Sequence, residues 1–481
     1  MNLQQFVRIQ TRRDFFRRCA GGIETIALAQ LLAGDGYGAT LPQAGGADPL
    51  APKKPPFPAT AKNVIFLFQE GAPSQLDLFA PKPELQKWAG KPLPASMTSQ
   101  LKLAFIKPTA AVLASPRTFT PSGKSGLEFS DYLPHTATCA DDICMVNSMF
   151  TDAFNHHPGQ LLLMTGTTQF GRPTMGAWAV YGLGSESKDL PGFVVLSSGV
   201  GTSGGESNFA SGFLPSTYQG VMFRNSGDPI LYLSNPKGIT RTLERNDLDA
   251  IRDLNQEHLT DTGDTEIASR IASYELAFRM QMAAPELLDF SKESAATLDM
   301  YGVNKEPTRP YATNCLLARR MVERGVRFVM LMHASWDQHT YLNRDLKKNC
   351  DITDQPTAAL IKDLKQRGLL DSTLIVWGGE FGRTPMVEIR NTSDPNNAGR
   401  DHHPLAYSMW LAGGGIKGGQ TVGRTDDLGF NIVEDKVHVH DLQATILNRL
   451  GFDHTRLTYH YMGRDFRLTD VEGNVVKKML V

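Results

Sequence analysis

The sequence predicts an α/β protein built on a doubly wound, mostly parallel central sheet with helices on both faces. Three observations predict this class. Short apolar runs without polar interruption recur along the chain, as expected of strands buried on both faces of a parallel sheet. Helical patterns alternate with these runs. Polar residues follow several runs directly, where an open α/β sheet places its ligand site.

The composition is that of an ordinary globular protein of 481 residues. Hydrophobic residues make up 41% and charged residues 21% of the chain, which is enough for a sizeable core. The 49 Lys and Arg residues almost balance the 50 Asp and Glu residues, for a formal net charge of -1. This balance argues against a nucleic-acid partner or a polybasic membrane contact.

The first 40 residues have the features of a twin-arginine export signal. "TRRDFF" (11–16) precedes a weakly apolar stretch and a small-residue exit near residue 40. The apolar stretch carries Glu24 and is too short and polar for a stable membrane span. An amphipathic helix with a chance Arg-Arg pair is the alternative. We expect a periplasmic or other extracytoplasmic location.

The folded body is expected to follow a Pro/Ala-rich linker over 41–60 and to form one domain over 61–481. "KNVIFLF" (62–68) predicts its first strand. The other expected strands are apolar runs bounded by turn residues, at 141–149, 192–198, 326–333, 372–379 and 404–415.

Helices are expected where apolar residues recur at helical spacing and a glycine follows. This applies to 314–325, to 358–370 and to 440–451. The segment from about 200 to 301 breaks the alternation. It begins Gly/Ser-rich and then becomes charged and helical, which predicts an insertion or lid beside the sheet.

The cysteines do not indicate a disulfide framework or a structural zinc site. Their number is odd and they include no CxxC pair. Two arrangements of Cys139 and Cys144 remain open: a disulfide that forms after export, or neighbouring positions in one helix without a disulfide. The five are Cys19, Cys139, Cys144, Cys315 and Cys350.

Residue types that bind metals gather where the expected strands end. A single Asp or His in a loop is usually only solvated. Here such residues follow four of the expected strands. The carboxyl ends of parallel strands lie at one edge of the sheet, so these residues are expected to form a shared polar site. Carboxylates and imidazoles without thiolates suit one or two divalent ions, Zn, Mn, Mg or Ca, as in two-metal phosphoester sites. The polar residues next to these strand ends are Glu70, Asp77, Asn155, His156, His157, Asp337, His339, Glu380, Arg383, Asp401, His402 and His403.

Several motifs resemble the alkaline phosphatase–sulfatase superfamily in their order along the chain. They are "NVIFLFQEG", "TG" at 165–166, "GVRFVMLMHASWDQH", "TLIVWGGEFGRTP", "LAGGGIKGGQ" and "HDLQATILNRLG". With the twin-arginine start, "GEFGRTP…GRDHHP…LAGGGIKGGQ" looks like an exported domain-of-unknown-function family within that superfamily. The likeness covers nearly all of the mature chain and is weakest over 199–300.

The resemblance implies an alkaline phosphatase-like sheet carrying two metals, with Asp, His and sometimes Glu as ligands. A Ser, Thr or modified Cys at the start of a helix then attacks phosphorus or sulfur in line. By position, Glu70 resembles the acidic ligand after the first strand. The other implied ligands are Asp337 and His339, Glu380, and either His402 or His403.

The chain departs from the superfamily pattern at two places. Phe381 stands where a histidine ligand is usual, so one metal is lost or Asp401 replaces that ligand. No cysteine lies in a C-x-P-S-R setting, which argues against a formylglycine sulfatase.

The nucleophile and the anion contacts therefore have to come from other residues. Thr151 is the leading nucleophile candidate, with Asn155 and His156 as contacts to oxygens of the reacting group. Ser74 is its rival, with a helix N-cap as the alternative role. Arg383 either binds an anionic substrate group or forms a salt bridge with Glu380.

The function these features indicate is an exported, metal-dependent hydrolase of phosphate or sulfate esters. The expected substrate is a small-molecule or polysaccharide ester. The alternative is a catalytically inactive relative that acts as a metal- or glycan-binding component of an exported complex.

Overall fold

The computed structural model describes residues 48–481 except 99–102, 200–202, 225–229, 231–234 and 390–396. The predicted export signal and Cys19 lie outside the described residues, as do residues 41–47 of the predicted linker. Residues 48–60 form no helix or strand. They lie against the body, where Leu50 is buried in the core.

Nine strands form the central sheet. They are β1 (Asn63–Gln69), β4 (Ile143–Phe150), β5 (Phe193–Ser198), β6 (Val221–Phe223), β7 (Phe328–His333), β8 (Thr373–Gly378), β11 (Tyr407–Ala412), β12 (Gln420–Val422) and β15 (Val437–His438). Their order is β12-β4-β11-β8-β1-β7-β5-β6, with β15 also paired to β4. Every pair is parallel except those that β11 makes with β4 and β8. The predicted α/β class with a mostly parallel sheet is confirmed.

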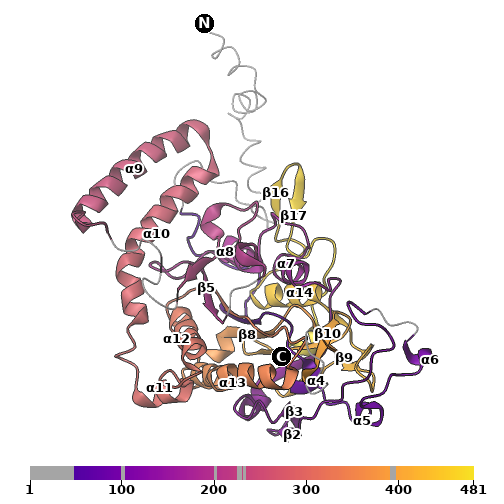
Figure 1. Cartoon of the computed structure of the whole chain (residues 1–481). Coiled ribbons are helices and arrows are strands. Elements are labelled where there is room, and N and C mark those ends of the chain that lie inside the picture. The colour runs from indigo at the N-terminus through magenta and orange to yellow at the C-terminus, as the bar shows by residue number, and fades with distance from the viewer. Residues whose placement is uncertain (1–47, 99–102, 200–202, 225–229, 231–234, 390–396) are drawn as a thin grey trace.

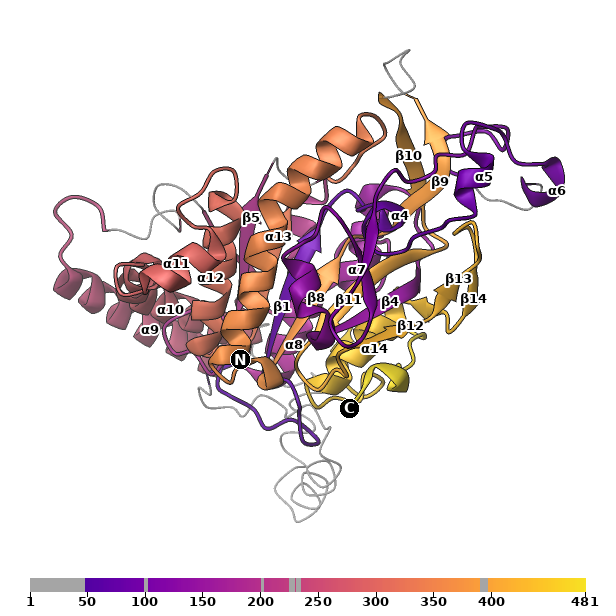
Figure 2. The ribbon, with the colours of Figure 1, turned by 90° about the horizontal axis from the view of Figure 1, so that it is seen from below.

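Helices cover both faces of this sheet (Figure 2). Successive side chains of a strand point to opposite faces, so Phe66 and Phe68 of β1 join one core cluster while Ile65 and Leu67 join the other. The first cluster includes residues of α7 (His156–Thr165), α8 (Met175–Leu183) and α14 (Val439–Arg449). The second includes residues of α10 (Thr265–Leu288), α12 (Arg309–Glu323) and α13 (Leu342–Gln366).

The remaining elements are short or peripheral. The further helices are α4 (Gln75–Leu78), α5 (Leu85–Trp88), α6 (Ala95–Thr98), α9 (Arg241–Thr262) and α11 (Ala295–Tyr301), with short 3-10 turns at η1 (Thr136–Asp142), η2 (Gly205–Asn208), η3 (Ser216–Tyr218), η4 (Leu370–Ser372) and η6 (Lys477–Met479). Four two-stranded sheets pair β2 (Phe119–Ser122) with β3 (Leu127–Ser130), β9 (Gly382–Glu388) with β10 (Gly399–His403), β13 (Arg424–Thr425) with β14 (Ile432–Glu434), and β16 (Tyr459–Tyr461) with β17 (Arg464–Phe466). Within the described part of the chain, no helix is both long and apolar enough to span a membrane.

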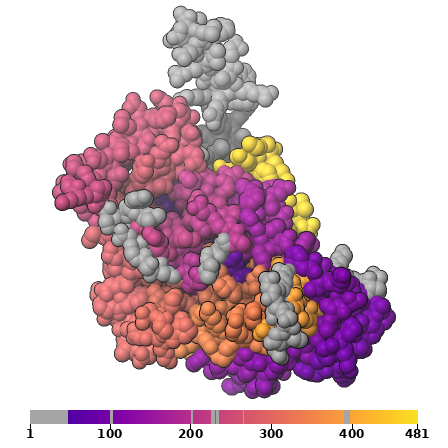
Figure 3. Space-filling view, in the orientation of Figure 1, coloured from indigo at the N-terminus to yellow at the C-terminus, as the bar shows by residue number. Residues whose placement is uncertain are grey.

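The segment expected to be an insertion contains a projecting pair of helices. α9 and α10 stand out on one side of the molecule (Figures 1 and 3), and α9 has no buried residue. The segment is not wholly outside the sheet, because β6 lies within it and pairs with β5.

A helix is present where one was expected at 358–370, but α13 begins at Leu342 and ends at Gln366. Pro356 and a polar first half conceal its start in the sequence. No strand was expected over 380–385 or 401–403, yet Gly382–Glu388 and Gly399–His403 are strands β9 and β10, which pair antiparallel. These strands carry buried polar residues in place of apolar alternation, so their pattern does not read as a strand.

The four cysteines in the described part of the chain are free and buried, including Cys139 and Cys144. The pairing left open for these two is therefore absent from this structure.

The reversed direction of β11 determines where the preceding residues lie. Parallel strands end at one edge of the sheet, and an antiparallel strand begins there. β10 directly precedes β11, and β9 directly follows β8. The hairpin of β9 and β10 therefore lies at the edge where β1, β7 and β8 end.

Candidate metal centre

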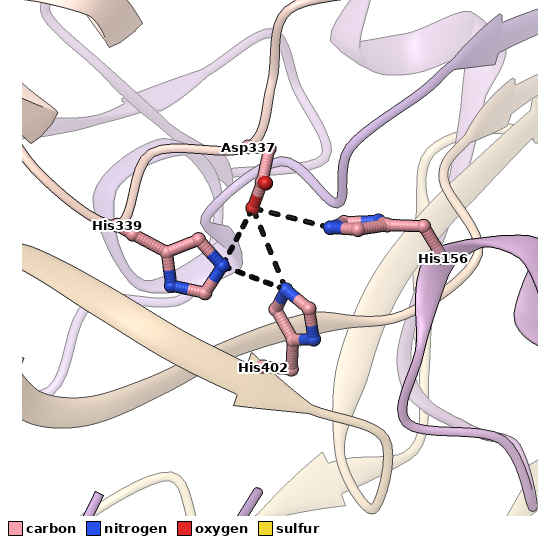
Figure 4. Close-up of side chains that lie close together, drawn as sticks. All are labelled: His156, Asp337, His339 and His402. Carbon is pink, nitrogen blue, oxygen red and sulfur yellow. Dashed lines mark hydrogen bonds and ion pairs between the residues drawn. The ribbon is translucent and has the colours of Figure 1, made fainter. Parts of the chain in front are cut away.

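Four side chains converge at this edge: His156, Asp337, His339 and His402 (Figure 4). The Asp337 Oδ1 atom lies 3.2 Å from His156 Nε2, 2.9 Å from His339 Nε2 and 3.4 Å from His402 Nε2. The Nε2 atoms of His339 and His402 are 2.9 Å apart. Three imidazole nitrogens and one carboxylate oxygen therefore face a common point.

The four residues come from segments far apart in the sequence. His156 is the first residue of α7, Asp337 and His339 lie in the loop after β7, and His402 lies in β10. The loop after β7 packs closely on the end of β1. Gly71 has φ +107°, and a Cβ atom there would lie 2.6 Å from the Asp337 backbone nitrogen. Glycine at this position thus lets the two loops meet.

Each histidine is held by a hydrogen bond at its other ring nitrogen. The Nδ1 atoms of His156, His339 and His402 lie 2.6 Å from Glu380 Oε1, 2.5 Å from Glu388 Oε2 and 2.7 Å from the Phe154 carbonyl oxygen, respectively. These oxygens accept, so each Nδ1 donates its hydrogen. The Nε2 lone pair then points to the common point, as in histidines that ligate metals.

The geometry and chemistry of these donors fit a divalent cation. Because Nδ1 donates in both rings, the Nε2 lone pairs of His339 and His402 face one another at 2.9 Å. Two lone pairs repel at this distance, and only a proton or a cation between them removes the repulsion. Ligands 2.0–2.1 Å from a tetrahedral zinc ion are about 3.3 Å apart, close to the observed separations. Imidazole with carboxylate suits zinc and the neighbouring first-row metals.

Arg383 of β9 holds Asp337 in place. Its Nη2 donates to Asp337 Oδ1 at 2.5 Å and to the Gly71 carbonyl, and its other nitrogens donate to the Ala72 and Arg400 carbonyls. The side chain is fully buried. It therefore pairs with Asp337, not with Glu380, and these contacts leave it little capacity to bind a substrate anion.

The charges of the cluster shift its pKa values in opposite directions. Burial acts to raise the pKa of Asp337, but its contacts with the three histidines and the charge of Arg383 hold it well below its usual range. Burial acts to lower the pKa of His156, but Asp337 and Glu380 outweigh it and raise this pKa to about 9. Burial lowers the pKa of His402 to about 4. Metal binding therefore competes with a proton on His156.

Glu70 and Glu380 lie beside the cluster, bridged by Gln160 of α7. The Gln160 amide nitrogen lies 3.0 Å from Glu70 Oε1 and 3.4 Å from Glu380 Oε1. The second oxygen of Glu70 is buried without a hydrogen-bond partner among the described residues. Burial, together with the nearby Glu380, raises the pKa of Glu70.

The two adjacent histidines of β10 have different neighbours. His403 Nε2 lies 3.0 Å from the Phe430 carbonyl, and the ring does not join the cluster. Alternation along a strand explains the separation, because successive side chains point to opposite faces. Had the segment been recognised as a strand, the sequence alone would have predicted that the two histidine side chains point to opposite faces.

Asp401 is engaged by backbone groups. Its Oδ2 accepts hydrogen bonds from the Phe105 and Ile106 amides at 2.7 and 3.1 Å, and its Oδ1 accepts from the His402 amide at 2.8 Å. It also lies with His339 and Glu388 in a second group of potential ligands. Its role as a substitute metal ligand stays a prediction.

Neither nucleophile candidate is among the four converging side chains. The Thr151 hydroxyl is buried with no hydrogen-bond partner among the described residues. The Ser74 hydroxyl donates to Asp77 Oδ2 at 2.5 Å. Asn155 is the exposed N-cap residue of α7 and makes no side-chain cap bond. Phe381 is buried, with its ring 5.1 Å from that of His156 and 4.6 Å from that of His402.

Sequence reasoning did not identify Gln160 or Glu388. Gln160 lies four residues after His156 in α7, so the two share a helix face, and this spacing was a usable signal. Glu388 ends β9, and nothing in its neighbourhood marks it, since the strand itself was not recognised.

Comparison with known proteins gives a family match and remote structural likenesses. A family model described as "Protein of unknown function (DUF1501)" matches residues 61–480. No curated protein matches the chain in sequence.

Three solved structures illustrate the structural likenesses. The lipoteichoic acid synthase LtaP from Listeria monocytogenes is 8% identical, with 92% of this chain and 80% of that chain covered and a TM-score of 0.34. The PsFucS1 sulfatase from Pseudoalteromonas sp. is 12% identical, with 93% and 80% covered and a TM-score of 0.35. The alkaline phosphatase from the Antarctic bacterium TAB5 is 11% identical, with 81% and 97% covered and a TM-score of 0.30.

Proposed function

Since the chain belongs to the DUF1501 family of proteins of unknown function, we propose its function from the candidate metal centre: it is a metal-dependent hydrolase of phosphate or sulfate esters. The observation that carries the proposal is the convergence of three imidazole Nε2 atoms and the Asp337 carboxylate. Each imidazole is oriented by a hydrogen bond at Nδ1, so the donors are arranged before any ion binds.

His156, Asp337, His339 and His402 would hold a divalent ion, which polarises an ester oxygen and lowers the pKa of water when bound. The protein orients these groups and leaves one side accessible. The side chains of Asp337 and His156 are 43% and 20% exposed, whereas that of His402 is 3% exposed. An ester therefore reaches the centre from the exposed side, where Asp337 and His156 lie. The buried Arg383 holds Asp337 in place on the opposite, interior side.

Water is the attacking group we propose, in place of a hydroxyl side chain. Ser74 is committed to Asp77. The Thr151 hydroxyl makes no hydrogen bond to a neighbouring base in the described part of the chain, and such a base is what activates a hydroxyl nucleophile. Thr151→Ala should therefore keep most of the activity.

Hydrolysis of simple aryl esters tests the proposal. The purified protein is stripped with a chelator, reloaded with Zn²⁺, Mn²⁺, Mg²⁺ or Ca²⁺, and given p-nitrophenyl phosphate, bis-p-nitrophenyl phosphate and p-nitrophenyl sulfate. We expect metal-dependent turnover of at least one ester, lowered about 100-fold or more by Asp337→Asn. Asp152→Asn, at an exposed acid, is the matched control. Loaded protein that hydrolyses none of the three contradicts the proposal.

A second candidate function is a metal- or glycan-binding component without catalysis. The observation that favours it is Phe381, whose ring packs against those of His156 and His402. The superfamily resemblance implies a histidine ligand at this position. This candidate predicts stoichiometric metal binding with no ester turnover under any metal. Turnover that Asp337→Asn removes excludes it.

We also propose that the chain is exported by the twin-arginine route, on the residues at 11–16. Replacing Arg12 and Arg13 with lysine should keep the protein in the cytoplasm of a host with a twin-arginine translocase. Cell fractionation and N-terminal sequencing of the exported form measure this. Equal export of the wild type and the double variant contradicts it.

A further inference from the structure

Two large apolar side chains are exposed at the rim of the metal centre. Phe105 is 51% exposed and Phe154 is 48% exposed. Their ring centroids lie 6.4 Å apart at an interplanar angle of 63°. The Phe105 ring also lies 5.4 Å from the His402 ring and 6.3 Å from the His339 ring. The two phenylalanines therefore border the metal ligands directly.

The backbone of each phenylalanine is bonded to a residue of the site. The Phe105 amide donates to Asp401 Oδ2 at 2.7 Å, and the adjacent Ile106 amide donates to the same atom. The Phe154 carbonyl accepts from His402 Nδ1 at 2.7 Å. These bonds hold the backbone of both phenylalanines beside the cluster. A neighbouring pair of half-exposed phenylalanines beside a polar cluster is a feature of ligand sites.

We propose that Phe105 and Phe154 form an aromatic subsite that binds a flat aromatic ring attached to the ester. Aromatic rings prefer edge-to-face or offset contacts at 4.5–7 Å. The existing pair has this geometry, and each ring is about half exposed. Phe105 and Phe154 offer no hydrogen-bonding side-chain atoms, so an apolar aromatic ring matches the surface they present better than a polyol does. The inference rests on the proposed function and names its substrate class, an aryl ester.

Binding of two phosphonates measures the subsite without requiring turnover. Isothermal titration calorimetry compares phenylphosphonate with methylphosphonate on protein loaded with Zn²⁺. We expect phenylphosphonate to bind about tenfold more tightly, the advantage of one or two aromatic contacts. Phe105→Ala and Phe154→Ala should each remove most of this advantage and leave methylphosphonate binding unchanged.

Two further variants separate the subsite from general effects. Phe105→Tyr keeps the ring and should keep the advantage. Leu254→Ala removes an exposed apolar side chain of α9, which lies on the opposite side of the molecule from β9 and β10 (Figures 1 and 2), and should change neither affinity.

The outcomes distinguish the two proposals. Equal affinities for the two phosphonates, or an advantage that survives both alanine variants, overturns the aromatic subsite and leaves the proposed function standing. Failure of both phosphonates to bind the metal-loaded protein contradicts the proposed function and the subsite together.

Discussion

His402 and His403 are neighbours in the sequence with different environments in the structure. His402 presents Nε2 to Asp337, whereas His403 bonds the Phe430 carbonyl on the other side of β10. The sequence supports a metal role for one of the two but does not say which. Asp337, His339 and His156 were also foreseeable as site residues, because they follow recognisable strands. Glu388 was not, since its role depends on a strand pairing that no local pattern shows.

At the residue scale, Glu388 should tune metal affinity without touching the ion. Glu388→Gln replaces the carboxylate that accepts the His339 Nδ1 hydrogen with a neutral amide. Loss of such an outer partner lowers metal affinity about 10- to 100-fold, and competition with a chromophoric chelator measures it. Glu434→Gln, which breaks an exposed pair with Arg424, is the control. An affinity unchanged in Glu388→Gln would show that this carboxylate does not orient the ligand.

At the scale of elements, the β9–β10 hairpin positions the ligands, and Arg400 anchors it. Arg400 of β10 is fully buried, with Nε 2.8 Å from Asp77 Oδ2 and Nη1 2.7 Å from the Leu113 carbonyl. Burial acts to raise the pKa of Asp77, but Arg400 and two serine hydroxyls outweigh it and lower this pKa. The pair ties β10, which carries His402, to α4, the short helix that follows β1.

Asp77→Asn should destabilise the protein by about 3–5 kcal/mol, because it leaves the Arg400 charge buried and unpaired. Denaturant titration measures this. The folded-state pKa of Asp77 is depressed, so its contribution is fully present above the unfolded-state value of about 3.9 and is lost as the pH falls through the folded-state value. The stability gap between wild type and variant should therefore narrow below about pH 4.

Glu84→Gln is the matched control for that substitution. It breaks the exposed pair with Lys87 and should change stability by at most about 1 kcal/mol. A similar small loss in Asp77→Asn would mean that the buried pair does not anchor β10.

Strands made of buried polar residues, such as β9 and β10, are the elements that the sequence does not predict. The apolar strands β1, β4, β5, β7, β8 and β11 were foreseeable because burial on both faces produces continuous apolar runs. β9 and β10 were not, because their residues are buried yet polar. These polar residues belong to the candidate site, and they replace the apolar residues that would otherwise identify the two segments as strands.

At the scale of the whole molecule, strand direction brings the site together. β1, β7 and β8 end at the edge where antiparallel β11 begins, so loops and β10 meet there with the start of α7. The alternation of strands and helices predicted this edge, as it is a general property of the fold class. It did not predict the reversal of β11 or the place of β6 in the sheet, because strand order depends on long-range pairing.

Elemental analysis of the purified protein beside its His402→Ala and His403→Ala variants tests the metal centre most directly. After loading with a divalent metal and dialysis, we expect about one bound ion per chain in the wild type and in His403→Ala. His402→Ala should lose most of it, because one of four converging donors is gone. Equal metal content in the two variants, or none in the loaded wild type, would contradict the assignment of His156, Asp337, His339 and His402 as a metal centre.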